Sequence, residues 1–312
     1  MQPQSNYMKK IFGTALVLSL AASTSFGQGF YFRGGLGYAF AQAGSSTDGT
    51  GQPYNGTQNN TNSLTTYNLK GASFSAGVQG NLGVGYLFSD HVGVQLDAGF
   101  GLSTKKYTYN ANNVTVNGVL SNVSIVQQAK TPVVMMPSLV IQSGGDKINL
   151  YSRLGIALPL NTKITEDQII TNAPGTGATE VDDFTFKVKN YFSLGFSAAA
   201  GLQYKVNDKV SIWGEVSILS LSAYIKEADL TAVTANGQSV SLTQVSGNQT
   251  IKYSKTANVD STYSTQPSYS QPFSNIGVNV GLSFNFGKSR GGHTSRRSNS
   301  DDALDDKPFR RR

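Results

Sequence analysis

Apolar and polar residues alternate with a period of two along most of the chain after residue 28. In the clearest case, between Ile276 and Phe286, six apolar side chains alternate with Gly, Asn and Ser. A period of two is that of a β-strand, whose successive side chains point to opposite faces. Eight strands are predicted in this way: Phe30–Phe40, Phe74–Phe88, Val92–Leu102, Thr131–Gln142, Ile148–Leu160, Phe192–Val206, Val210–Tyr224 and Ile276–Phe286. The fourth has the weakest pattern, because it is apolar in both phases and contains Pro137.

The connections between these strands alternate between short and long. Short joins occur at residues 89–91, 143–146 and 207–208, whereas the long ones span 41–70, 104–130, 161–189 and 226–273. Such alternation predicts an up-and-down meander. It is typical of outer-membrane barrels, which have short periplasmic turns and long extracellular loops. An even number of strands places both chain ends on the periplasmic side.

A soluble barrel of the lipocalin type also has eight alternating strands and is the competing interpretation. The polar phase, however, is mostly Gly, Ser, Asn and Gln, which suit the narrow interior of an eight-stranded barrel better than a water-exposed surface. Aromatic residues near strand ends in the apolar phase suit lipid-facing girdles: Tyr38, Phe40, Tyr86, Phe88, Phe192, Tyr204, Tyr224 and Phe286. We therefore expect an all-β fold, an eight-stranded antiparallel up-and-down transmembrane β-barrel.

Charge is scarce and concentrated at the two ends of the chain. Charged residues make up 14% of 312 residues, against roughly 25% in ordinary soluble domains. The net charge of +7 comes mostly from Lys9, Lys10 and the segment 288–312, which holds eight Lys and Arg against four Asp. The chain between them is close to neutral, so we expect no basic binding face there and no nucleic acid as a partner. The absence of cysteine excludes disulfides and thiolate metal sites.

The N-terminus has the pattern of an export signal. Lys9 and Lys10 precede the apolar run 11–22, and small residues follow up to Gly27. We expect a signal peptide over residues 1–27, with the mature chain starting near Gln28. The barrel would then occupy residues 28–288, and residues 289–312 would form a flexible basic periplasmic tail.

The last predicted strand carries a recognisable motif. Asn279 and Gly281 are followed by the alternating aromatics Phe284 and Phe286. With this motif, residues 28–288 resemble the small eight-stranded outer-membrane β-barrel proteins typified by OmpX and the membrane domain of OmpA. The resemblance implies that the motif is an assembly signal read by the barrel-assembly machinery. It departs from the family pattern because 26 residues follow Phe286.

Charged residues in the inward phase form a predicted network within the barrel. Four of them, counted from the periplasmic start of their strands, are expected at similar depth: Arg33, Asp97, Arg153 and Glu215. Since an isolated buried charge is very costly, they should pair and plug the lumen. Bulky Tyr151 and Trp213 would narrow it further. Alternatively, strand tilt separates their heights and each charge contacts water.

The sequence offers little catalytic chemistry. Its two histidines are His91 in a short turn and His293 in the tail, and no metal-binding spacing occurs. The positions of these two histidines disfavour a lipid-directed enzyme. We therefore expect a non-enzymatic protein without a cofactor. The expected role is envelope-structural or surface interaction. A channel for small or hydrophobic molecules and an accessory barrel of a secretion apparatus remain alternatives.

The expected partners are outer-membrane lipid, the assembly machinery and a surface ligand bound through the loops 41–70, 104–130, 161–189 and 226–273. These loops are rich in Ser, Thr, Asn and Gly, which favours either disorder or strand extensions with mobile tips. In the second loop, Tyr107, Tyr109, Val114 and Val116 keep the strand period, so some strands should continue beyond the membrane.

Overall fold

The structure is a computed structural model that describes residues 29–42, 57–59, 72–116, 119–172, 181–245, 249–256 and 265–286. The predicted signal peptide over residues 1–27, the predicted tail over 289–312 and His293 lie outside these described residues.

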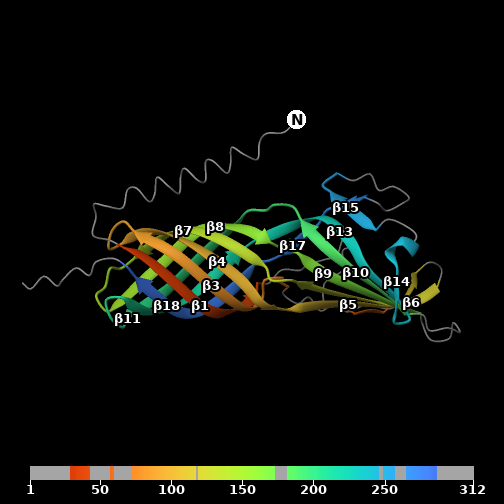
Figure 1. Ribbon diagram of the computed structural model, residues 1–312, viewed down its shortest axis with the longest axis horizontal. Coiled ribbons are helices and arrows are strands. Elements are labelled where there is room, and N and C mark those ends of the chain that lie inside the picture. The colour runs from red at the N-terminus through yellow and green to blue at the C-terminus, as the bar shows by residue number, and fades with distance from the viewer. Residues whose placement is uncertain are drawn as a thin grey trace, which may run out of the picture.

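Eight antiparallel strands close into a barrel in the order β1-β18-β12-β11-β8-β7-β4-β3 (Figure 1). Their bounds are β1 Phe30–Ala41, β3 Gly77–Leu87, β4 Val92–Thr104, β7 Val133–Gln142, β8 Ile148–Asn161, β11 Gly195–Lys205, β12 Val210–Ser220 and β18 Asn275–Asn285. The first and last strands pair along their whole length, with Arg33 opposite Ser283. This confirms the predicted fold class and strand count.

Three predicted strand ends were wrong. The second barrel strand begins at Gly77 instead of Phe74, and the sixth begins at Gly195 instead of Phe192. The seventh ends at Ser220, and the chain continues into a separate strand after Leu221. At the first of these positions, Gly77 has a φ of 127°, a backbone conformation that favours glycine and redirects the chain entering the strand.

A second sheet continues the barrel wall beyond its long-loop end (Figure 1). Its strands are β2 Thr57–Asn59, β5 Lys106–Val116, β6 Val119–Ala129, β9 Ile164–Asn172, β10 Val181–Asn190, β13 Ser222–Ala235, β15 Thr250–Ser254 and β16 Thr265–Pro267. The short strands β14 Gln238–Val240 and β17 Ser270–Pro272 pair with β13, and a short 3-10 helix covers Leu242–Gln244. We call this assembly the outer sheet.

The outer sheet extends five barrel strands. Each of these five barrel strands is followed or preceded in the chain by one strand of the outer sheet: β4 by β5, β7 by β6, β8 by β9, β11 by β10 and β12 by β13. The five outer strands are hydrogen-bonded to one another in the same order as the barrel strands that they extend. The predicted continuation of strands beyond the membrane is thereby confirmed in the second loop. It also occurs in the third and fourth loops, where β9, β10 and β13 agree with the strand extensions that were one of the two expected states of the loops.

Side chains divide between the two faces of the barrel wall as the alternation predicted. Apolar residues such as Leu154 (67% exposed) and Phe196 (70%) point outward. Polar residues such as Gln95, Asn149 and Asn279 point inward and are buried. Within the described residues, no helix is long and apolar enough to cross a membrane.

Candidate functional site

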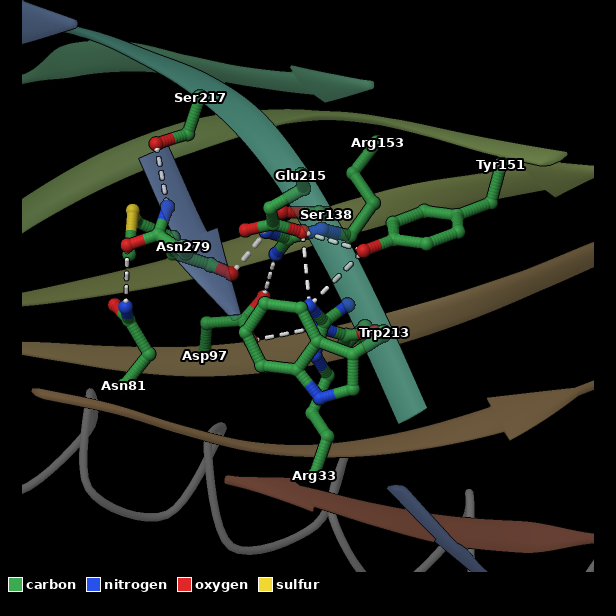
Figure 2. Close-up of polar contacts among 12 residues, drawn as sticks. Arg33, Asn81, Asp97, Ser138, Tyr151, Arg153, Trp213, Glu215, Ser217 and Asn279 are labelled. Atoms are coloured by element: carbon green, nitrogen blue, oxygen red, sulfur yellow. Dashed lines mark hydrogen bonds and ion pairs between the residues drawn. The ribbon is translucent and has the colours of Figure 1, made fainter. Parts of the chain in front are cut away.

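The four charged residues singled out in the sequence meet inside the barrel (Figure 2). Counted along the chain, they lie on the first, third, fifth and seventh strands of the barrel: Arg33 on β1, Asp97 on β4, Arg153 on β8 and Glu215 on β12. Each lies on the inward phase, and their side chains are only 3–10% exposed. We call this group the charge belt.

Glu215 is the centre of the charge belt. Its Oε2 lies 2.8 Å from Nη2 of Arg33, and its Oε1 lies 2.6 Å from Nη2 of Arg153. Arg153 also forms an ion pair with Asp97 through its other terminal nitrogen. Two cations and two anions therefore form one continuous chain of ion pairs, Arg33–Glu215–Arg153–Asp97, whose formal charges balance.

Aromatic and amide side chains complete the belt on the side of the short turns. The guanidinium of Arg33 lies 3.7 Å from the ring centre of Trp213, a cation–π distance. Tyr151 donates from its hydroxyl to Glu215 at 2.8 Å and accepts from Arg33 at 3.1 Å. On the opposite wall, Gln95 donates to Asp97 at 2.6 Å and accepts from the hydroxyl of Tyr31 at 2.7 Å.

Glycines on the neighbouring strands make room for these large side chains. A Cβ at Gly35 would lie 2.5 Å from the Trp213 ring and 2.5 Å from the carbonyl oxygen of Val280. A Cβ at Gly281 would lie 2.6 Å from the same ring. The lumen at the level of the charge belt is therefore filled, as expected for an eight-stranded barrel.

The charge belt divides the lumen into two spaces. On the short-turn side lies an open vestibule of about 490 Å³, lined by Arg33, Tyr151 and Trp213 and by polar residues such as Gln142 and Asn149. On the other side lies a cavity of about 50 Å³, whose lining includes Arg153, Glu215, Asn81, Ser138, Asn275 and Asn279. The belt lines both spaces and separates them.

A buried apolar cluster closes the barrel a second time at the long-loop end. Its centre is Phe74, which is fully buried and lies 5.4 Å from the Tyr107 ring and 5.8 Å from the Phe273 ring. The Tyr107 hydroxyl donates to the carbonyl of Ser73 at 2.8 Å and accepts from its amide at 2.7 Å. Barrel residues Val134 and Leu219 belong to the cluster and also line the small cavity. We call this cluster the apolar cap.

The motif residues of the last strand lie on both faces of the wall. Asn279 is buried in the lumen, where it accepts from Asn81 and donates to Ser217, each at 2.9 Å. Gly281 faces Trp213, whereas Phe284 and Phe286 are exposed on the outer surface at 39% and 73%. The first two thus have roles in lumen packing; the role of the motif in assembly stays a prediction.

Sequence reasoning named the four charges, Tyr151 and Trp213, but it missed Tyr31, Gln95 and the apolar cap. A signal for the first two was present. Two positions before each charged residue, on the same inward phase, the sequence has a large aromatic or amide residue: Tyr31, Gln95, Tyr151 and Trp213. The cap had no such signal, because its central residues come from segments outside the regular barrel strands.

The remaining candidates do not join the belt. His91 is exposed in the turn between β3 and β4, at the short-turn end, with Nδ1 3.2 Å from the carbonyl oxygen of Gln142. Among the described residues, no group of three or more His, Cys, Asp or Glu side chains has an arrangement that could hold a metal ion.

Comparison with known proteins adds a family match. The family model described as outer membrane protein beta-barrel domain matches residues 12–246. A comparison with curated proteins found no match. Among solved structures, the outer membrane protein OprG from Pseudomonas aeruginosa is similar, with a TM-score of 0.39, 13% identity, and coverage of 84% of this chain and 97% of that chain. A major outer membrane protein from Thermus thermophilus has a TM-score of 0.35, 11% identity, and coverage of 82% and 99%.

Proposed function

Because the chain belongs to the outer membrane protein beta-barrel domain family, we propose that it is a non-conducting barrel whose role is carried by the outer sheet. The protein is located in the outer membrane. In barrels of this kind the short turns face the periplasm, so the outer sheet projects from the cell surface. The proposed role is envelope-structural or surface interaction, and it assigns no catalytic step to the chain.

The observation that carries the proposal is the double closure of the lumen. The charge belt fills the barrel at mid-height, with all four side chains at most 10% exposed. The apolar cap closes the extracellular end, with Phe74 and Phe273 fully buried. An ion crossing the barrel would have to break the charge belt and then displace the packed apolar cap. In the cap the ion would lose its hydration shell and find no polar groups to replace the water.

The outer sheet supplies the second support. A solvent-exposed segment that served only as a connection would not need five strands with continuous pairing. Here β6, β9 and β10 pair with their neighbours over most of their length, with few register shifts. A sheet of this kind presents side chains at fixed positions, which suits recognition better than a mobile loop does.

Conductance of the purified protein in planar bilayers tests the closed lumen. We expect no stable channel at either polarity, and no uptake of small sugars in liposome-swelling assays. Stable conductance or sugar uptake by the unmodified protein would favour the transport alternative and refute the closed barrel.

Photo-crosslinking on intact cells tests the surface role. A benzophenone amino acid at Ser124 or Thr185, both on the outward face of the outer sheet, should form adducts with a surface macromolecule. The matched control places it at Leu154, which is 67% exposed on the lipid-facing wall. Adducts at Leu154 alone, or none beyond lipid at any position, would contradict a role in surface interaction.

A further inference from the structure

Lysines gather on the outward face of the outer sheet, close to where it leaves the barrel. They are Lys106 on β5, Lys130 after β6, Lys163 before β9, and Lys187 and Lys189 on β10. All five are exposed. We call this group the lysine patch.

The strand register places these lysines side by side. The amide of Lys130 donates to the carbonyl of Lys163 at 3.0 Å, so the two are cross-strand neighbours. Val188 pairs with Ile164, which brings Lys189 next to Lys163 on the other side. Ile164 and Val188 are buried on the inward face, so the adjacent lysines point outward.

A second row lies one step further from the barrel. Lys106 pairs with Gln128, Gln128 with Thr165, and Thr165 with Lys187. The patch therefore consists of two rows that span β5, β6, β9 and β10, with lysines at five of the positions.

Two carboxylates on β13 compensate part of the lysine patch: Asp229 lies opposite Lys187, and Glu227 lies opposite Lys189. Lys189 bonds to Glu227 and Asp229 at 2.7 Å each, and hydrogen bonds to Asp229 and Glu227 raise the pKa of Lys189. The other four lysines form no ion pair in the part of the chain that the structure describes. Like charges directly opposite each other destabilise a sheet. An external anion would relieve that repulsion.

The outward acidic residues of the same strands lie further from the membrane. Asp167 is two positions beyond Thr165 on β9, and Asp183 is four positions beyond Lys187 on β10. On β5, β6, β9 and β10 the rows nearest the barrel therefore hold lysines, and the carboxylates of these strands lie further out. The same two rows end on β13 at Glu227 and Asp229, so five lysines stand against two carboxylates. The excess of positive charge at the membrane-proximal rows favours an anion.

The patch lies at the height of lipid headgroups. Lys163 follows the lipid-facing Leu160 by three residues, and Lys189 precedes Phe192 by three residues. Leu160 is 66% exposed and Phe192 is 72% exposed. Three residues of strand correspond to about 10 Å, less the effect of strand tilt. Lysine ammonium groups therefore lie just above an apolar surface that suits acyl chains.

We propose that the lysine patch binds the phosphate groups of a phosphorylated glycolipid in the outer leaflet, whose acyl chains pack against Leu160 and Phe192. The protein is located in the outer membrane, so this surface contacts the outer leaflet. An ammonium group close to an anionic lipid surface contributes about 1 kcal/mol. The inference does not depend on whether the lumen conducts.

The test measures binding of purified diphosphorylated lipid A to the intact protein in detergent micelles, by native mass spectrometry and titration. The variant Lys130→Gln/Lys163→Gln removes two unpaired charges from the patch. The control Lys147→Gln/Lys209→Gln removes two exposed lysines from the short turns at the opposite end. At about 1 kcal/mol per lysine, we expect about 30-fold weaker binding for the patch variant and unchanged binding for the control.

A second measurement needs no variant. The unmodified protein should bind dephosphorylated lipid A far more weakly than the diphosphorylated form, and its affinity for the latter should fall as salt rises. Equal binding of the two lipids overturns the proposal, as does an equal loss in both variants. Failure of the unmodified protein to bind lipid A also overturns it, and leaves a soluble polyanion as the occupant to examine.

Discussion

Replacement of Glu215 by Gln is the sharpest perturbation of the charge belt. The substitution keeps the shape of the side chain but removes the charge that two guanidinium groups share, at 2.8 Å from Arg33 and 2.6 Å from Arg153. Asp97 then remains as the only anion of the belt, and the belt carries one uncompensated positive charge. The residue is only 6% exposed, so bulk water cannot replace the lost partner.

The expected cost follows from this geometry. Removing one partner of a buried ion pair destabilises a protein by about 3–5 kcal/mol, because the other charge stays buried and unpaired. The hydroxyl of Tyr151 donates to the same carboxylate at 2.8 Å and loses a charged acceptor as well. We therefore expect Glu215→Gln to lower the free energy of unfolding by an amount within that range.

Equilibrium unfolding in urea, with the protein in lipid vesicles, measures this cost. Trp213 is the single tryptophan of the chain and lies against Arg33 at 3.7 Å, so its fluorescence reports on the belt. The matched control is Lys147→Gln, an exposed lysine in a short turn, for which no measurable change is expected. A change for Glu215→Gln no larger than for this control would refute the buried network.

The double variant Arg33→Gln/Glu215→Gln adds a test of pairing. It restores charge balance and leaves the ion pair between Arg153 and Asp97 intact. If Arg33 and Glu215 are coupled, the double variant should lose less stability than the sum of the two single variants, by about 0.5–3 kcal/mol. Additive losses would mean that each charge is stabilised independently, for instance by water.

Three further predictions concern assembly, processing and packing. Phe286→Ala should lower the yield of heat-modifiable, protease-resistant barrel more than Phe100→Ala does; equal yields would count against the assembly motif. N-terminal sequencing of protein from outer-membrane fractions should start near Gln28, and retention of the apolar leader would contradict export by a cleaved signal. Gly35→Ala should cost about 1–3 kcal/mol in unfolding free energy and shift the Trp213 emission, since its Cβ meets the ring; an unchanged spectrum and stability would show that the ring is free to move.

The barrel and its charge belt could be predicted from the sequence because both follow from residue positions counted along each strand from the nearest short turn. A period of two fixes which side chains face inward, and short turns fix where each strand begins. Arg153, six residues after Lys147, and Glu215, six residues after Lys209, therefore had to lie at similar depth. The same counting indicates their neighbours Tyr151 and Trp213.

The apolar cap could not be predicted in this way. Phe74 is in phase with the lipid-facing residues of β3, and periodicity alone would place it outside the barrel. The positive φ of Gly77 changes the direction of the chain, and Phe74 becomes fully buried. Its partner Phe273 is almost 200 residues away in sequence. Contacts between residues so far apart in the sequence depend on how the irregular segments fold over the open end of the barrel. No local sequence pattern predicts that arrangement.

The charge belt also depends on a difference in side-chain size between neighbouring strands. Strands β1, β4, β8 and β12 run outward from the short turns and contribute the large charged residues. On two of the inward-running strands, β3 and β11, the residues opposite these charges are small: Gly83 faces Arg33 and Asp97, Ala199 faces Arg153, and Gly201 faces Glu215. On β7 and β18 the opposite residues are Met136, Val140, Ser283 and Asn279. In a lumen just wide enough for side chains to fill, this alternation of large and small residues lets four long side chains converge at one depth. Gly83 and Gly201 therefore leave space that the ion pairs need, because a Cβ at Gly83 would meet Asp97 and a Cβ at Gly201 would meet Glu215.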